Sequence, residues 1–452
     1  MSDATKPARG MRDFLPDDVR RRAYVIGVVA EVYERYGFEP LETPAVENIE
    51  TLMGKYGEDG NRLIFKILKR GEHERTGEAD LALRYDLTVP LARVVAEHRG
   101  RLPRFFKRYQ IQPVWRADRP ARGRFREFYQ CDVDAIGSTS PVVEADVCAA
   151  VSEVLERLGF NDFVVRLNHR EVLRALLDGA GVPGALHDTA LVAIDKLDKI
   201  GPDGVRGELE TRGIDAAAAA RTLDAFARPA SPSNESWLGT LESRIPAGHA
   251  PGLQGLATLR SILALSAGTP AGPRLQLDPS LARGLSYYTG AIFEIAVPDL
   301  AGSLGGGGRY DGLIGMFSGE QVPACGFSLG LERILVVMGE RGMFPASVQT
   351  TGADVLATIW NADAAGDTLA LARMLRAAGL RVEVYPEADK LGKQMKYAAS
   401  RGIPFAVIVG DDERAAGTVM VKDLRTGGQQ PVPRGEAAGW IRDRLSPAPT
   451  TA

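Results

Sequence analysis

Residues 104–137 read RFFKRYQIQPVWRADRPARGRFREFYQCDVDAIG, and we expect the rest of the chain to be organised around them. Aromatic and β-branched residues are frequent from about 105 to 115, which predicts a first β-strand. A second strand is predicted at about 125–136. Between the two, Pro120 and Gly123 are typical of turns. The stretch therefore predicts two strands joined by a long basic loop.

The second predicted strand is unusual because one of its faces is polar. Successive side chains of a strand point to opposite faces, so Phe125, Glu127 and Tyr129 share one face. The other face carries Arg126, Phe128, Gln130, Asp132 and Asp134. Polar groups in the middle of a sheet must be hydrogen-bonded. This pattern therefore indicates a polar ligand that lies on the sheet.

The loop between the strands is dense in arginine. Its basic residues are Arg116, Arg119, Arg122, Arg124 and Arg126, against the single acid Asp118. The guanidinium group is always charged, and its planar fork matches phosphate oxygens. A solvated basic loop is the alternative, since charge runs often form solvated faces. Further arginines in ARGLSYYTG (Arg283) and GLER (Arg333) favour a phosphate-binding site assembled from distant segments.

Length and composition are those of an ordinary globular protein. The 452 residues leave room for two to four domains. A hydrophobic content of 45% and a charged content of 25% are typical of a folded chain. The net charge of −3 gives no general support for nucleic-acid binding, so any such surface must be local.

The cysteines and the N-terminal residues indicate the cellular compartment in which the protein is expected. The three cysteines form no CxxC pair, so we expect neither a disulfide framework nor a zinc site. The N-terminal MSDATKPARG has no apolar stretch of the kind found in signal peptides. No run of about 18 apolar residues, the length of a membrane span, occurs. We therefore expect a cytoplasmic protein that does not enter a membrane.

Changes of pattern along the chain predict its organisation. Alanine-rich helical segments follow residue 170 and give way to strand patterns after 267. Near the C-terminus, strands at about 354–359, 381–385, 405–409 and 417–423 alternate with helices at about 366–378, 391–401 and 435–445, which predicts a small α/β domain. The expected divisions are a core formed by 1–169 and 268–340, a helical insertion at 170–267, a linker at 341–352, the α/β domain at 353–446 and a disordered tail at 447–452.

Three familiar motifs are incomplete in this chain. GFSLG (326–330) matches the G-x-S-x-G motif of hydrolases, but in that fold the histidine follows the serine, whereas every histidine here precedes Ser328. The glycine run 305–308 lacks the last glycine of G-x-G-x-x-G, and GKQMK (392–396) lacks the upstream glycine of a P-loop. No standard nucleotide-binding fold is therefore indicated.

Several other motifs resemble those of class II aminoacyl-tRNA synthetases. FREFYQ (125–130) after the basic loop is similar to motif 2 of that class, GFSLGLER (326–333) to motif 3, and PLETP (40–44) to the end of motif 1. More specifically, four segments resemble those of the histidyl-tRNA synthetase family. They are LRYDLTVPLAR (83–93), REFYQCDVD (126–134), ARGLSYYTG (282–290) and GGGGRYDGL (305–313). KLGKQMKYA (390–398) and VKDLRTG (421–427) resemble the anticodon-binding domain of the class.

The resemblance implies both a fold and a reaction. The fold would be an α+β catalytic core on an antiparallel sheet, with an inserted helical subdomain and a C-terminal α/β anticodon-binding-like domain. The reaction would be the ATP-dependent attachment of L-histidine to histidine tRNA through histidyl-adenylate, with release of pyrophosphate and AMP. ATP would be a substrate, accompanied by Mg²⁺, with no tightly bound cofactor and no metal-binding residues. Motif 1 implies a homodimer, the commonest symmetric assembly.

The resemblance also assigns roles to residues at matching motif positions. The expected catalytic residues are Arg116, Arg283 and Arg333. The residues expected to bind histidine are Asp86, Thr88, Arg116, Gln130, Asp134, Arg283, Tyr287 and Tyr288. Of these, Asp86, Thr88 and Gln130 would hold the amino group, and Asp134, Tyr287 and Tyr288 the imidazole. The residues expected to bind ATP are Arg116, Asp118, Arg124, Phe128 and Arg333.

One departure keeps a second hypothesis open. Ser286 stands where the family usually has aspartate within RGLDYYTG, which bears on the hydrogen bonds around Arg283. The alternative is a catalytically silent paralogue that acts as a regulatory subunit, such as that of ATP phosphoribosyltransferase. Such paralogues typically lack the C-terminal domain and degrade the 282–290 motif, whereas this chain keeps both apart from Ser286.

Overall fold

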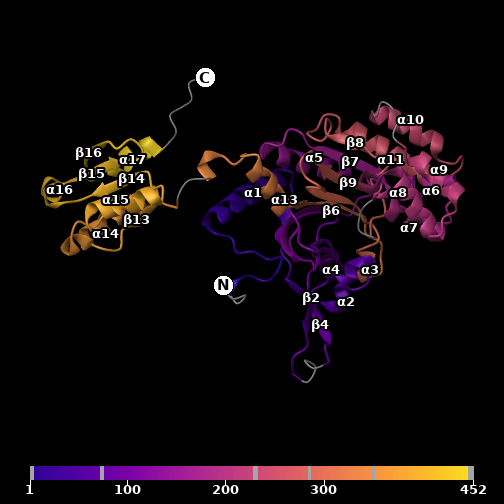
Figure 1. Cartoon of the computed structure of the whole chain (residues 1–452), viewed down its shortest axis with the longest axis horizontal. Coiled ribbons are helices and arrows are strands. Elements are labelled where there is room, and N and C mark those ends of the chain that lie inside the picture. The colour runs from indigo at the N-terminus through magenta and orange to yellow at the C-terminus, as the bar shows by residue number, and fades with distance from the viewer. Residues whose placement is uncertain (1–4, 72–75, 228–232, 283–286, 349–351, 446–452) are drawn as a thin grey trace. The chain divides into compact units, whose positions relative to one another are not determined.

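The computed structural model describes residues 5–71, 76–227, 233–282, 287–348 and 352–445. Contacts divide the chain into two compact units, Met1–Phe344 and Pro345–Ala452. Figure 1 shows the first unit in indigo to orange and the second in orange to yellow. Each unit contains a sheet of its own, and the first contains a smaller sheet in addition.

The first unit is built on an eight-stranded sheet in which antiparallel pairs predominate. The strands lie in the order β1 (Glu39–Pro40), β5 (Phe106–Trp115), β6 (Glu127–Ile136), β11 (Ala324–Gly330), β10 (Gly305–Arg309), β9 (Ala291–Ala296), β7 (Val164–His169) and β8 (Leu275–Leu277). The pairs β1–β5 and β7–β8 at the two edges are parallel. The predicted hairpin forms β5 and β6, with Phe106 opposite Ile136 and Trp115 opposite Glu127. The antiparallel core that we expected is therefore confirmed.

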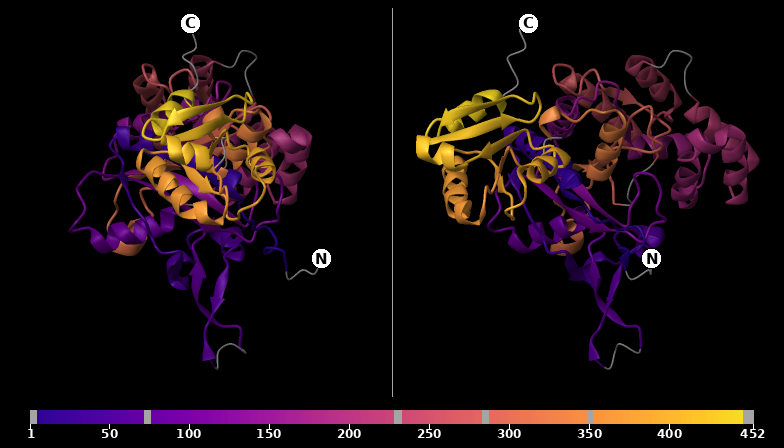
Figure 2. Two further views of the ribbon diagram at one scale, coloured as in Figure 1. Left: turned by 90° about the vertical axis from the view of Figure 1, so that its left-hand side faces the viewer. Right: turned by 60° about the vertical axis from the view of Figure 1, so that its left-hand side comes forward.

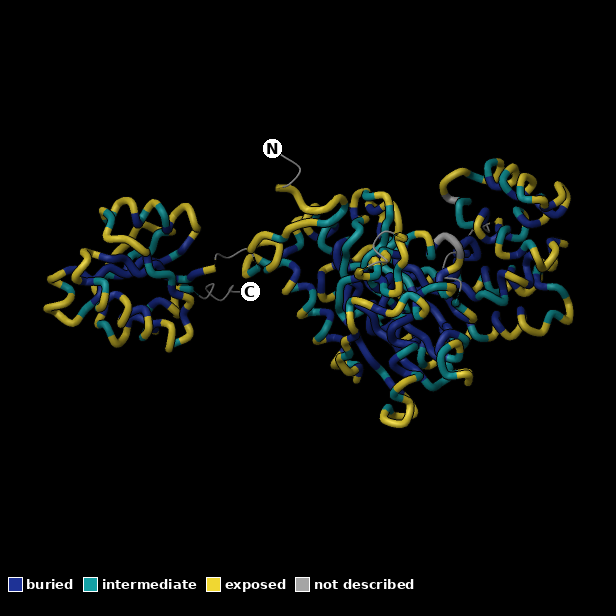
Figure 3. The backbone as a smooth tube through the Cα atoms, turned by 90° about the horizontal axis from the view of Figure 1, so that it is seen from below, coloured by how far each residue is buried: buried dark blue, intermediate teal, exposed yellow. Residues whose placement is uncertain are grey.

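One face of this sheet is apolar and is covered by helices. Helix α1 (Pro16–Arg35) buries Val25, Val29, Val32 and Tyr33, which lie on one side at helical spacing. Helix α5 (Val142–Arg157) packs on β11, and α13 (Leu331–Glu340) packs on β6. In Figure 3 the interior of the first unit is mostly dark blue, the colour of buried residues. The polar side chains of β6 alternate to the opposite face, which is left for a ligand.

A small sheet projects from the first unit. Its three strands are β2 (Val46–Asn48), β4 (Ala79–Leu83) and β3 (Lys66–Leu68), and both views of Figure 2 show the β3–β4 hairpin pointing away from the main sheet. Short helices α2 (Ile49–Leu52) and α3 (Gly57–Arg62) connect β2 to β3. Strand β3 begins only at Lys66, because Leu63 caps the C-terminus of α3. Helix α4 (Thr88–His98) follows β4, and α12 (Gly315–Ser318) packs against it.

A run of helices separates β7 from β8. It consists of α6 (Arg170–Ala180), η3 (Gly184–Leu186), α7 (His187–Ile194), α8 (Leu197–Thr211), α9 (Ala216–Phe226), α10 (Asn234–Arg244) and α11 (Ala250–Ser266). Helix α8 is kinked at Gly201, whose φ of 69° is not helical, next to Pro202. Helix α6 packs on β7, and α11 packs on β7 and α5, so the run is anchored to the core at its two ends.

The second unit is a five-stranded sheet with helices. Its strand order is β13 (Val382–Val384), β12 (Val355–Ala357), β14 (Phe405–Ile408), β15 (Thr418–Asp423) and β16 (Gln429–Pro433). The helices are η4 (Ala346–Val348), η5 (Ala362–Ala364), α14 (Ala365–Ala377), α15 (Leu391–Ser400), α16 (Asp411–Ala416) and α17 (Ala437–Leu445). Strand β16 and helix α16 are not among the predicted elements. Pro431 and Pro433 argue against a strand by pattern, but β16 lies at the sheet edge, where proline is tolerated.

Candidate active site

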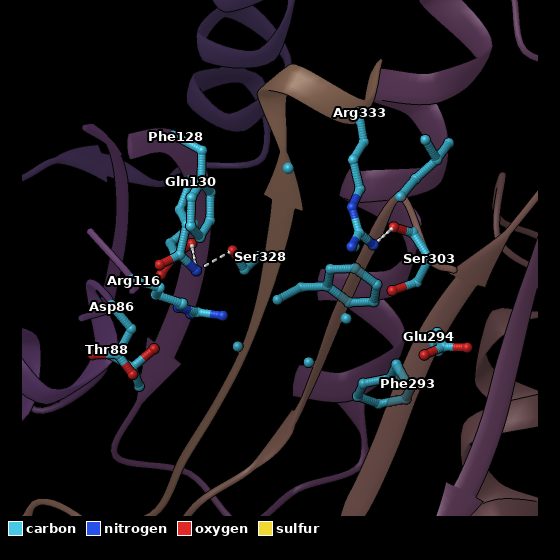
Figure 4. Close-up of a pocket in the computed structure, with 18 of the residues that line it drawn as sticks. Asp86, Thr88, Arg116, Phe128, Gln130, Phe293, Glu294, Ser303, Ser328 and Arg333 are labelled. Carbon is cyan, nitrogen blue, oxygen red and sulfur yellow. Dashed lines mark hydrogen bonds between the residues drawn. The ribbon is translucent and has the colours of Figure 1, made fainter. Parts of the chain in front are cut away.

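The polar face of the main sheet lines a cavity of about 350 Å³. Its walls come from the start of α4, the basic loop, β6, β9, β10, β11 and the start of α13. Figure 4 shows two groups of side chains in it, with Asp86, Thr88 and Arg116 to one side and Glu294 and Arg333 to the other. The cavity thus brings together segments that lie far apart in the sequence.

The middle of the cavity floor consists largely of glycine. On β10 the polar face carries Gly306 and Gly308, and on β11 it carries Gly326 next to Ser328. A Cβ atom at Gly326 would lie 1.8 Å from Oδ1 of Asp134, so no larger residue fits there without a shift. The absence of side chains makes the floor flat, which suits a ligand that lies along the sheet.

Two buried carboxyl groups share one cation on this face. Asp132 and Asp134 are two residues apart on β6, and Arg108 lies opposite Asp134 on β5. Arg108 Nη2 is 2.8 Å from Oδ2 of Asp134 and 4.0 Å from Oδ2 of Asp132. The Tyr310 hydroxyl donates to Asp134. Burial raises the pKa of both acids, that of Asp132 to about 7, although the positive charge of Arg108 opposes this effect.

A second acidic site lies at the start of α4. Asp86 accepts hydrogen bonds from the Tyr56 hydroxyl at 2.9 Å, a backbone N–H of α4 at 3.1 Å and the Tyr287 hydroxyl at 3.2 Å. Burial raises the pKa of Asp86, while these hydrogen bonds and nearby Arg116 lower it. Burial raises the pKa of the Tyr287 hydroxyl, and nearby Thr88 lowers it. An acid and a hydroxyl side by side are well suited to bind an ammonium group.

Arg116 connects this acidic site with the basic loop. Its Nε donates to the carbonyl oxygen of Tyr85 at 3.0 Å, which fixes the side chain near Asp86. Its guanidinium carbon lies 4.3 Å from the ring centre of Tyr85 and 5.2 Å from that of Phe128. Phe128 therefore presents an aromatic face on the polar side of β6, where a flat ring can stack.

The opposite end of the cavity is cationic. Arg333 Nε donates to the carbonyl oxygen of Gly123 at 3.3 Å, and its Nη1 donates to that of Ser303. Arg124 is about half exposed, and its Nη1 is 4.0 Å from Oδ1 of Asp118. Guanidinium groups that converge on one cavity are the groups that bind phosphate oxygens best.

The described site residues that the sequence predicts all line this cavity. They are Asp86, Thr88, Arg116, Asp118, Arg124, Phe128, Gln130, Asp134, Tyr287, Tyr288 and Arg333. Arg283 and Ser286 lie outside the described residues. Phe125, assigned by alternation to the other face, precedes β6 and also lines the cavity. The structure thus brings the predicted residues together, while their individual roles stay predictions.

Sequence reasoning missed several groups of this site. They are Arg108, Asp132, Glu294, Ser328, Tyr310 and Glu332. Glu294 interrupts the apolar AIFEIAV, and Asp132 belongs to the polar face of β6, so both carried a signal in the sequence. No pattern in the sequence indicated a role for Arg108, because its partner Asp134 is defined only by the register of β5 and β6.

The described residues also bear on metals and membranes. Among them, no group of three or more His, Cys, Asp or Glu side chains is arranged to hold a metal ion. None of the helices in the described ranges is both long enough and apolar enough to span a membrane.

Comparison with known proteins relates the chain to one family. A model of histidyl-tRNA synthetase matches residues 10–334, and a model of the anticodon binding domain matches residues 354–444. A histidine–tRNA ligase of Porphyromonas gingivalis is 45% identical over 442 residues, covering 94% of this chain and 96% of the relative. One of Gloeobacter violaceus is 43% identical over 463 residues, covering 96% and 98%. The crystal structure of histidyl-tRNA synthetase from Nostoc sp. PCC 7120 matches with a TM-score of 0.81 and 32% identity, covering 98% of this chain and 99% of that one. The chain therefore belongs to the histidyl-tRNA synthetase family.

Proposed function

We propose that this chain attaches L-histidine to histidine tRNA in two steps. The carboxylate of histidine attacks the α-phosphate of ATP and forms histidyl-adenylate with release of pyrophosphate. The terminal ribose of the tRNA then takes the histidyl group, and AMP leaves. The observation that carries the proposal is the single cavity with buried carboxylates at one end and convergent arginines at the other. Such a cavity fits an amino acid and a nucleotide end to end, and family membership supports this assignment.

The acidic end would bind histidine. Asp86, Thr88 and Gln130 would hold the ammonium group, because an ionised acid, a hydroxyl and an amide oxygen all accept its hydrogen bonds. Asp134, with Tyr287 and Tyr288, would bind the imidazole. Arg116 would lie beside the carboxylate that reacts, and Arg283 would bridge that carboxylate and the α-phosphate.

The cationic end would bind ATP. Arg116 and Arg333 would hold the phosphates near the reacting atom, Arg124 the far phosphate, and Phe128 would stack on adenine beside Asp118. Catalysis would come from positioning and from stabilising the charge that develops on phosphate, without a protein nucleophile. Mg²⁺ would enter bound to ATP, since Mg²⁺ is often held by substrate phosphates with only one or two carboxylates.

We further propose how the chain assembles and where it acts. A homodimer would form through the segment at 38–47, which resembles motif 1. The second unit would bind the anticodon arm, with exposed Lys390, Lys393, Lys396 and Arg401 facing the RNA. Two of these are partly neutralised, because Lys393 lies 2.7 Å from Asp389 and Arg401 lies 3.7 Å from Glu383. The free, buried thiols of Cys131, Cys148 and Cys325 suit the reducing cytoplasm.

The experiment is ATP–pyrophosphate exchange by the purified chain. We expect exchange to require histidine and to be absent with any other amino acid, and we expect the chain to charge histidine tRNA. The silent regulatory paralogue is less well supported, because the near-full-length relatives are histidine–tRNA ligases. A folded protein that shows no histidine-dependent exchange would favour that paralogue instead.

A further inference from the structure

The serine of GFSLG has no nucleophilic role in this structure. None of the described residues that line the cavity is a histidine, so Ser328 has no imidazole base. Ser328 nevertheless lies on the polar face of β11, directly opposite Asp132 of β6 and Gly306 of β10. Its place at the centre of the cavity floor calls for a different explanation.

Ser328 is hydrogen-bonded to the side chain of Gln130. Gln130 Nε2 donates to Ser328 Oγ at 2.6 Å, as Figure 4 shows. Ser328 also lies directly opposite Asp132 and lowers the pKa of that carboxyl group. Gln130 Nε2 also lies 3.5 Å from Oδ1 of Asp132. An amide nitrogen can only donate hydrogen bonds, so the Ser328 hydroxyl accepts from Gln130.

The hydrogen bond to Ser328 determines which end of the Gln130 amide remains available to a ligand. With Nε2 held by Ser328, Oε1 has no hydrogen-bond partner among the described residues and is shielded from solvent. Leaving a buried acceptor without a donor costs about 1–3 kcal/mol, which a donor on a ligand would recover. Gln130 lines the cavity, so that donor can come from the bound molecule.

We propose that Ser328 is a positioning residue, which holds the Gln130 amide so that Oε1 accepts from the ammonium group of the substrate. This inference rests on the proposed function, since it names the group of histidine that Gln130 binds. Without the hydroxyl, only the 3.5 Å contact with Asp132 among the described residues holds Nε2, so the amide can rotate and present this donor to a cation. The loss should therefore affect ligands that carry an amino group and spare ligands that lack it.

The test compares two ligands by isothermal titration of the full chain. L-Histidine carries the ammonium group, whereas 3-(imidazol-4-yl)propionate keeps the imidazole and the carboxylate but has no amino group. For Ser328→Ala we expect the Kd for histidine to rise about tenfold, the scale of one hydrogen bond to a charged group. The Kd for the desamino analogue should stay within about twofold, and so should the KM for ATP.

Two further variants make the result specific. Ser328→Thr keeps the hydroxyl and should bind histidine as the wild type does, because Gly306 opposite leaves room for a methyl group. Ser328→Gly removes the hydroxyl again and should behave as Ser328→Ala, since Gly326 and Gly330 already occupy the same face of β11. Ser152→Ala is the matched control, because Ser152 is a buried serine of α5 whose hydroxyl has no partner among the described residues.

Equal weakening of both ligands by Ser328→Ala and Ser328→Gly would make Ser328 a structural residue and overturn the inference. Unchanged histidine binding in either folded variant would overturn it as well. A double-mutant cycle gives an independent measure: once Gln130→Leu has removed the amide, Ser328→Ala should weaken histidine binding little further. Wild-type protein that binds neither ligand and shows no histidine-dependent exchange would overturn the proposed function itself, and this assignment with it.

Discussion

Arg108 and Asp134 form a buried ion pair across β5 and β6, in which Nη2 lies 2.8 Å from Oδ2 and the two side chains are 0% and 3% exposed. The contact has the distance of an ion pair without the alignment of a hydrogen bond, since Oδ2 of Asp134 has no hydrogen-bond partner among the described residues. A charge in this position is tolerated only while its partner is present. The pair therefore couples the stability of the main sheet to the site proposed for imidazole.

We predict that Arg108→Met destabilises the first unit strongly. Removing one partner of a buried ion pair typically costs about 3–5 kcal/mol, because the other charge is left without compensation. Arg99→Met is the control, since its ion pair with Glu320 is exposed and such pairs contribute about 0–1 kcal/mol. Thermal unfolding of both variants measures the difference, and equal melting temperatures would contradict the prediction.

We predict that Asp134→Asn impairs the binding of histidine and leaves that of ATP nearly intact. Replacing the carboxylate removes a charge-assisted hydrogen bond to the imidazole N–H, worth about tenfold or more in affinity. Pyrophosphate exchange with each substrate varied in turn gives the two KM values. A parallel rise in both would indicate general damage to the cavity, of the kind that loss of the Arg108 partner can cause.

The stability of the chain should depend on pH through Asp132. Burial raises the pKa of Asp132 from 3.8 to about 7, so between these values the folded protein binds a proton that the unfolded chain does not. The contribution of this group is therefore fully present below about pH 4 and is lost as the pH rises through about 7. We expect Asp132→Asn, which cannot ionise, to gain melting temperature relative to wild type between pH 5 and pH 8. The same difference at both pH values would show that Asp132 does not titrate in this range.

We predict that Arg283→Ala lowers pyrophosphate exchange by a factor of about 100 or more, the scale expected for one lost donor to the transition state. Arg283 lies outside the described residues, so the prediction rests on its motif, ARGLSYYTG. The melting temperature should change little. Near-normal exchange by the folded variant would refute the role proposed for Arg283.

A chain that ends at Phe344 should still form histidyl-adenylate but charge tRNA poorly. All residues proposed to contact histidine or ATP precede this point, and the second unit has a sheet and a hydrophobic core of its own. Both assays on one dimeric preparation give the answer, and the deficit in charging should appear in the KM for tRNA. Charging as efficient as that of the full chain would mean that the second unit does not bind tRNA.

The sequence predicts those parts of the molecule whose signals are local. The two strands predicted at about 105–115 and 125–136 form β5 (Phe106–Trp115) and β6 (Glu127–Ile136), because the residues that favour a strand lie within each segment itself. The polar face of β6 likewise predicts a ligand, since alternation along one strand is enough to place Gln130 and Asp134 together. Strand β16 escaped prediction because proline is excluded from the interior of a sheet but not from its edge.

Cross-strand relationships could not be predicted in this way. Ser328 and Gln130 are separated by 198 positions, and their contact depends on the register between β6 and β11. Arg108 sits among residues typical of a strand, and nothing near it in the sequence indicates that an acid lies opposite. The chemistry of the site is therefore visible in single segments, whereas the support of each side chain is visible only in the folded sheet.

The glycine floor has a consequence for the motion of the sheet. Glycine loses more backbone freedom on folding than other residues, by about 0.5–1 kcal/mol relative to alanine, and four of the five residues of β10 are glycine. Opening β10 therefore recovers more backbone entropy per residue than opening β6, although both strands lie inside the sheet. We expect its amide protons to exchange with deuterium faster than those of β6 in the free protein. Histidine and ATP together should slow this exchange most in β10. Binding of the substrates would then make the floor of the cavity more rigid.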